Sequence, residues 1–144
     1  MSTAPRPRII TVAFWLTMVG AVLLLAGGLV GVSTSLTTPA SAFPDSLGEG
    51  QAHRILLMHG GVGAVLAVAG LGLSFLAGRT RNGDKRFRRA LAALAGGVVF
   101  VVFLLALFAP YNLELLALIG VVPVAVGATL FTRPAAAAWF EDAT

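Results

Sequence analysis

The sequence predicts an all-α, polytopic membrane protein whose four transmembrane helices form two hairpins. Three observations support this prediction. Hydrophobic residues make up 58% of the chain and charged residues 11%, where soluble domains have roughly 25% charged residues. The mean hydropathy is +0.93, and the charges lie in short runs between long apolar segments. We expect residues 1–144 to form one membrane domain.

A strongly cationic run at residues 79–89 separates the apolar segments into two pairs. Cationic loops beside hydrophobic spans stay on the cytoplasmic face, so we expect the loop over residues 78–89 to be cytoplasmic. Both termini are then cytoplasmic too, and Arg54 is the one cation of ten on the outer side. Asn82 and Gly83 predict a turn within the loop.

This basic loop is a candidate contact for anionic lipids or for an acidic partner surface. The alternative is a loop that only fixes the topology and has no ligand. The six candidate contact residues are Arg79, Arg81, Lys85, Arg86, Arg88 and Arg89.

Four apolar segments are long enough to cross a membrane. The first would extend over about 36 Å at 1.5 Å per residue, more than a hydrocarbon core of roughly 30 Å. An outside loop at residues 33–54 follows it, and Pro123 lies in the middle of the fourth segment. The predicted spans are residues 9–32, 55–77, 90–109 and 113–132.

The first span has an alternative interpretation. A basic start, an apolar run and the residues Ala40, Ser41 and Ala42 resemble a signal peptide with an A-x-A cleavage site. The apolar run is longer than the roughly 7–15 residues of a signal-peptide core, so we favour a membrane span.

Small residues predict where the helices pack. At spacings of four, they let two helix backbones approach closely, and dispersion contacts then accumulate. The second span is the richest in glycine, so we expect it at the centre of the bundle. The third span has no polar side chain, and we expect it to face lipid or a hydrophobic partner. The predicted packing glycines are Gly27, Gly31, Gly60, Gly63 and Gly70.

A few polar residues gather at the predicted outer side. His59, Tyr111 and Glu114 would line a shallow pocket for a quinone head group, a haem or a partner's loop if the second and fourth spans are neighbours. His53 and His59 point roughly 240° apart on one helix and therefore cannot clamp a single haem. The alternative is that these residues are ordinary interfacial anchors and helix-end charges.

The sequence argues against several classes of function. There is no cysteine, which excludes disulfides, thiolate metal sites and cysteine nucleophiles. Nucleotide-binding loops and the HExxH and GxSxG motifs are also missing. The spans offer no acid, base or amide near the bilayer midplane, where a proton or ion carrier normally needs one. We therefore expect no enzyme activity, no cofactor and no metal.

The distribution of charge and of apolar segments also indicates which partners to expect. The positive charge lies beside apolar spans and not on a solvated fold, so lipids and membrane proteins are expected partners and nucleic acid is not. Abundant Ala, Gly and Val, with more Arg than Lys, are typical of a bacterium with a GC-rich genome, so we expect the inner (plasma) membrane. We predict a non-catalytic accessory or assembly subunit of a larger membrane complex, such as a respiratory one. The alternatives are a quinone-, haem- or lipid-binding module and a small transporter or channel.

Overall fold

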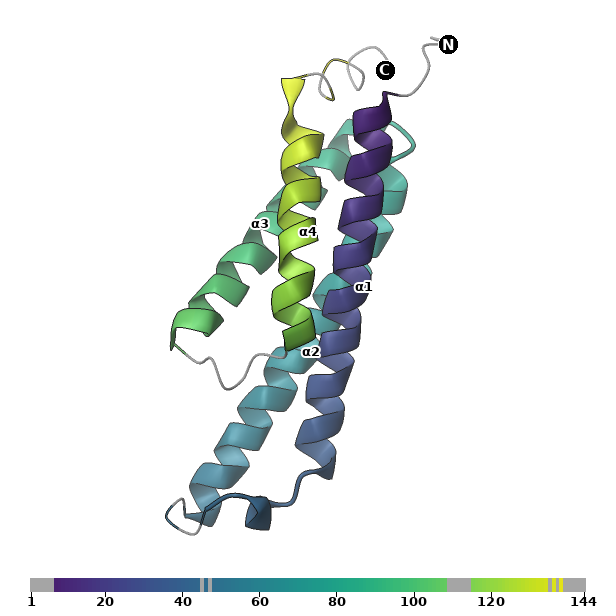
Figure 1. Cartoon of the computed structure of the whole chain (residues 1–144). Helices are drawn as coiled ribbons and strands as arrows, with labels where there is room; N and C mark the ends of the chain where they lie inside the picture. The colour runs from purple at the N-terminus through teal and green to yellow at the C-terminus, as the bar shows by residue number, and fades with distance from the viewer. Residues whose placement is uncertain are drawn as a thin grey trace.

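The structure, a computed structural model, describes residues 7–44, 46, 48–108, 115–134, 136 and 138. Four α-helices contain most of these residues, and no strand occurs among them (Figure 1). All four helices are long and apolar enough to cross a membrane, which confirms the predicted fold class at this level. The helices are α1 (Arg8–Thr37), α2 (Glu49–Thr80), α3 (Lys85–Phe108) and α4 (Leu115–Thr132), with a short 3-10 helix η1 (Ala40–Ala42) after α1.

The connection between α1 and α2 is shorter than the predicted loop at residues 33–54. Helix α1 continues to Thr37 and α2 begins at Glu49. The polar end of α1 is helical, and its hydroxyl groups bond within the helix, as where Ser35 Oγ donates to the carbonyl oxygen of Val32 at 2.7 Å. Hydropathy marks where the apolar residues stop, and the helices extend beyond that limit.

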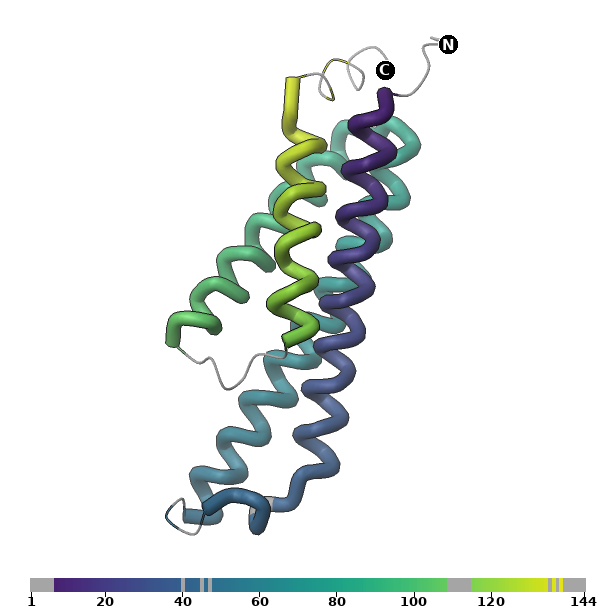
Figure 2. Tube along the Cα trace, viewed as in Figure 1, coloured from purple at the N-terminus to yellow at the C-terminus, as the bar shows by residue number. Residues whose placement is uncertain are grey.

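Helix α1 packs against α2 on one side and against α4 on the other, while α3 packs against the far sides of α2 and α4 (Figure 2). The expectation that the second span is central was therefore wrong, because α1 belongs to both of the extensive helix contacts. The physical reason is that α1 presents glycines in two directions. Gly20 and Gly27 face α4, whereas Gly28 and Gly31 face α2.

Helix α3 is the most loosely packed of the four. Only 22% of its most apolar stretch is buried, against 39% for α1 and for α2. In Figure 1, its C-terminal half leans away from α4 and α1. Its buried residues lie in the N-terminal three quarters and are Leu91, Ala95, Val98 and Val102.

The turn between α2 and α3 holds the start of α3 in place. Gly83 has a φ of 91°, a conformation that residues with a Cβ rarely adopt, and so it occupies the predicted turn. Asp84 then caps α3, because its Oδ1 accepts a hydrogen bond from the backbone N–H of Arg86 at 2.9 Å.

Candidate interaction surfaces of the bundle

The contact between α1 and α4 is a backbone-to-backbone seam. A Cβ atom added to Gly20 would lie 2.5 Å from the carbonyl oxygen of Gly120 and would collide with it. Seven residues further along α1, Gly27 faces the backbone of Ala117. Gly127, seven residues after Gly120, packs in the same way against Thr17.

The contact between α1 and α2 is built similarly. A Cβ atom on Gly63 would lie 2.6 Å from the carbonyl oxygen of Gly28, and one on Gly70 would lie 2.6 Å from that of Ala21. Gly63 and Gly70 are again seven residues apart. A seven-residue repeat keeps one face of a helix toward its neighbour over several turns, so these pairs hold both seams closed along their length.

All five glycines that the sequence singled out lie at these seams. Gly27 faces α4, Gly31 and Gly63 face each other across α1 and α2, Gly60 faces Ser35, and Gly70 faces α1. The sequence reasoning missed four further seam glycines, which are Gly20, Gly28, Gly120 and Gly127. The seven-residue spacing in α1, α2 and α4 is the signal that would have found three of them.

The surface shared by α2 and α3 contrasts with the seams. Gly61 and Gly97 are exposed, and a Cβ atom on either would meet no other atom within 4 Å. Two adjoining apolar grooves of about 280 and 270 Å³ lie between these helices. We name this surface the α2/α3 face and define it by Gly61, Val65, Ala93, Gly97 and Val101, all of them exposed.

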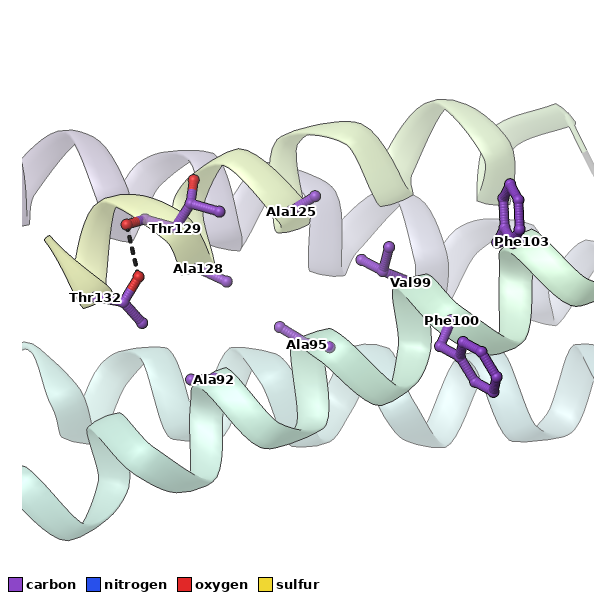
Figure 3. A pocket seen from close by; sticks show the side chains of 10 residues that line it. Ala92, Ala95, Val99, Phe100, Phe103, Ala125, Ala128, Thr129 and Thr132 are labelled. Carbon is purple, nitrogen blue, oxygen red and sulfur yellow. Dashed lines mark hydrogen bonds between the residues drawn. The ribbon is translucent and has the colours of Figure 1, made fainter.

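A larger groove of about 530 Å³ lies between α3 and α4, and we name it the α3/α4 groove (Figure 3). Half of its lining residues are small and come from both helices, namely Ala92, Ala95, Gly96, Ala125 and Ala128. Phe100 and Phe103 flank one end, while Thr129 and Thr132 lie toward the other, where α3 begins and α4 ends.

Most of the described cationic residues lie at the same end of the bundle, which we name the basic end. Arg8 begins α1, the basic loop joins α2 to α3, and Arg133 follows α4. Figure 1 shows these three places at one end of the helices. Arg54, near the start of α2, is the described exception.

The six predicted contact residues of the basic loop fall into two groups. Arg79 lies over the rings of Phe75 and Phe87, with its Cζ 5.5 and 5.8 Å from their centroids. Arg81 lies 4.9 Å from the ring centroid of Phe14 on α1. These guanidinium groups help to hold the helix ends together. The other four residues begin α3, where Arg86 and Arg89 are exposed and Lys85 and Arg88 are half-buried.

The predicted outer cluster is only partly described. His59 is half-buried on α2 and faces α1, since a Cβ atom on Gly31 would lie 3.7 Å from its Nε2. Tyr111 and Glu114 lie outside the described residues, so the pocket that would unite the three residues stays a prediction.

A cleft of about 610 Å³ lies nearby between the end of α1 and the start of α2. Exposed His53 lines it together with Ser35 and Thr38. The sequence did not point to this cleft, because His53 looked like a solvated residue in a loop. Among the described residues, no group of three His, Asp or Glu side chains is placed to hold a metal ion.

No family model, no curated protein and no solved structure matches this chain. Its function must therefore be argued from its own geometry.

Proposed function

We propose that this chain is a non-catalytic accessory or assembly subunit that binds a transmembrane helix of a larger bacterial inner-membrane complex, such as a respiratory one. The observation that carries the proposal is the pair of open glycines, Gly61 and Gly97, on the α2/α3 face. The binding surface is this face, and lipids surround the remaining helix surfaces.

Glycine favours helix association within lipid. Lipid tails are as apolar as the side chains, so helices associate through close packing, and small residues make that packing possible. Glycine inside a helix costs roughly 0.5–1 kcal/mol relative to alanine. In the α1 seams this cost is offset by backbone contact. On the α2/α3 face nothing in the described chain offsets it, whereas a partner helix laid against Gly61 and Gly97 would.

The orientation of the subunit completes the proposal. Four spans in two hairpins, with both termini in the cytoplasm, would put the basic end on the cytoplasmic face. Arg54 and the cleft beside His53 would then face the outside. This orientation is supported by the asymmetry of the cations between the two ends of the helices.

Site-specific photo-crosslinking in native membranes tests the proposal. A photoreactive residue at Val65 or Ala93, both on the α2/α3 face, should capture one and the same polytopic membrane protein. The same residue at Val22, an exposed position on α1, should capture lipid only. Gly97→Leu should abolish the capture, because the leucine blocks close approach of the partner helix.

Gly96→Leu is the matched control. It changes the adjacent glycine, which also meets no atom within 4 Å but lines the α3/α4 groove, so the capture should persist. Lipid adducts alone at Val65 and Ala93, together with recovery of a lone chain in mild detergent, would refute the accessory-subunit proposal.

The cleft beside His53 favours a second function, the binding of a quinone, haem or lipid head group at the outer end. A Soret band in the purified protein that is lost in His53→Ala or His59→Ala would support haem binding. A third function, a small transporter or channel, would require solute flux in proteoliposomes that contain this chain alone.

A further inference from the structure

We propose that the α3/α4 groove binds one acyl chain of an anionic phospholipid, with the lipid phosphate held by cations at the basic end. This inference does not depend on the accessory-subunit proposal, because the groove lies on the other side of α3 from Gly97. It states that one lipid of negative charge occupies a specific site, whereas the other helix surfaces are surrounded by bilayer lipid of any kind.

The chemistry of the groove walls selects an apolar occupant. The lining consists of carbon except for the hydroxyl groups of Thr129 and Thr132. Thr129 Oγ1 donates to the carbonyl oxygen of Val126 at 2.8 Å, and Thr132 Oγ1 donates to that of Thr129 at 2.9 Å (Figure 3). Both hydroxyl protons are therefore used within α4, and none remains to bind a polar ligand along the groove.

The size of the groove fits an acyl chain. Its α3 wall extends from Ala92 to Phe103, about 16 Å at 1.5 Å per residue. This is close to half of a hydrocarbon core of roughly 30 Å, the depth of one leaflet. An extended acyl chain is much thinner than a helix, and a groove of about 530 Å³ has room for one.

The charges at the basic end select an anionic head group. On α3, Lys85 and Arg89 precede Ala92 by seven and three residues, which places them on the same side of the helix as the groove. On α4, Arg133 directly follows Thr132. Cations thus flank both walls at the level where a head group would lie, and a guanidinium group can bind two phosphate oxygens at once.

The surroundings leave these cations available. Arg79 and Arg81 are stacked on aromatic rings, but Arg89 and Arg133 are exposed to solvent. Asp84 is the described acidic residue nearest to them in sequence, and its single negative charge is outnumbered by the five cations Lys85, Arg86, Arg88, Arg89 and Arg133. A phosphate at the basic end therefore meets an excess of positive charge.

Native mass spectrometry of the purified chain tests the site by titration with phosphatidylglycerol and with phosphatidylcholine of identical acyl chains. Phosphatidylglycerol should bind more tightly by roughly tenfold or more, since each basic residue near a head group contributes about fivefold. The double change Lys85→Gln and Arg89→Gln should remove most of this preference and leave phosphatidylcholine binding unchanged.

Substitutions that fill the groove test directly whether the lipid binds there. Gly96→Leu places a side chain into the groove without a clash, so binding of phosphatidylglycerol should fall at least tenfold. Gly97→Leu adds the same side chain on the α2/α3 face and should leave lipid binding unchanged. If Gly96→Leu loses helical content, then Ala125→Leu fills the groove from the α4 wall instead.

Three results would overturn the site. They are equal binding of the two lipids, equal effects of Gly96→Leu and Gly97→Leu, and displacement of phosphatidylglycerol by inorganic phosphate at matched concentration. Because the titration uses the purified chain without a partner, it can fail while the photo-crosslinking succeeds, or the reverse.

Discussion

The seams of α1 and the sides of α3 use glycine in opposite ways. In the seams, Gly20, Gly63 and Gly70 lie so close to a neighbouring backbone that a Cβ atom would come within 2.6 Å of a carbonyl oxygen. On α3, Gly96 and Gly97 meet nothing within 4 Å. The same residue type therefore closes one part of the bundle and leaves grooves in the other.

This difference separates a closely packed part of the bundle from a loosely packed one. Close backbone packing stabilises helix pairs in lipid, so α1 with α2 and α1 with α4 form the closely packed part of the bundle. Helix α3 is joined to α2 by the turn at Gly83 and buries only four residues, from Leu91 to Val102. A loosely packed, apolar helix with open glycines on two sides is suited to binding other molecules within the membrane.

The most severe test of the comparison is Gly63→Leu against Gly61→Leu, two residues apart on α2. Leucine at Gly63 would push against the backbone of Gly28 and force α1 away, so we expect a loss of about 3 kcal/mol in the free energy of unfolding. Leucine at Gly61 meets open space and removes the conformational freedom of glycine, so we expect no loss and a gain of up to about 0.5–1 kcal/mol.

Unfolding in mixed detergent micelles, followed by far-UV circular dichroism, measures both variants. If Gly61→Leu destabilised the purified chain as much as Gly63→Leu, the distinction between closed seams and open faces would be lost.

The four helices were predictable because hydropathy reports burial in lipid directly, without knowledge of tertiary contacts. The ends of the helices were less predictable. Thr37 and Ser35 look like loop residues in the sequence, yet they lie within α1, and their hydroxyl groups donate to backbone carbonyls of the same helix. Polarity therefore locates the limit of the apolar span better than the end of the helix.

The order in which the helices pack could not be predicted from the sequence. Each span is apolar around its whole circumference, so its side chains do not indicate which helix lies beside it. Glycine spacing identified contact residues such as Gly63 but not α1 as the shared helix, because that depends on which glycine faces match in space. The α3/α4 groove arises from the tilt of α3, for which there is no local signal. The sequence predicted the basic residues beside it as lipid or partner contacts, which stays a prediction, and it gave no sign that they lie beside a groove.

A second test changes the turn between α2 and α3 and leaves the glycine seams of α1 unchanged. Gly83→Ala forces a Cβ into the left-handed conformation of the turn, which should cost about 1–2 kcal/mol. Because Gly83 lies between α2 and α3, amide hydrogen exchange should accelerate along α3 and stay unchanged in α1. The matched control is Gly78→Ala, where the added Cβ meets no atom within 4 Å inside α2. Equal acceleration in all four helices would show that α3 is not held separately.

The cap of α3 allows a milder version of the same test. Asp84→Ala removes the acceptor for the N–H of Arg86 and should cost about 1 kcal/mol. Asp84→Asn keeps an oxygen acceptor in place, so it should retain most of the stability. Faster exchange at the first turn of α3 in the alanine variant, but not in the asparagine variant, would show that the cap and not the charge is what matters.

The smallest expected effect bears most directly on function. Gly96→Ala and Gly97→Ala each place a methyl group into open space and remove the conformational freedom of glycine, so each should stabilise the purified chain by about 0.5–1 kcal/mol. Thermal unfolding in detergent measures this gain. If Gly97→Ala is stabilising in isolation yet weakens capture of the partner, its glycine serves the contact between molecules and not the fold. If it destabilises the isolated chain, Gly97 has a role within the bundle, and the α2/α3 face loses its main support as a binding surface.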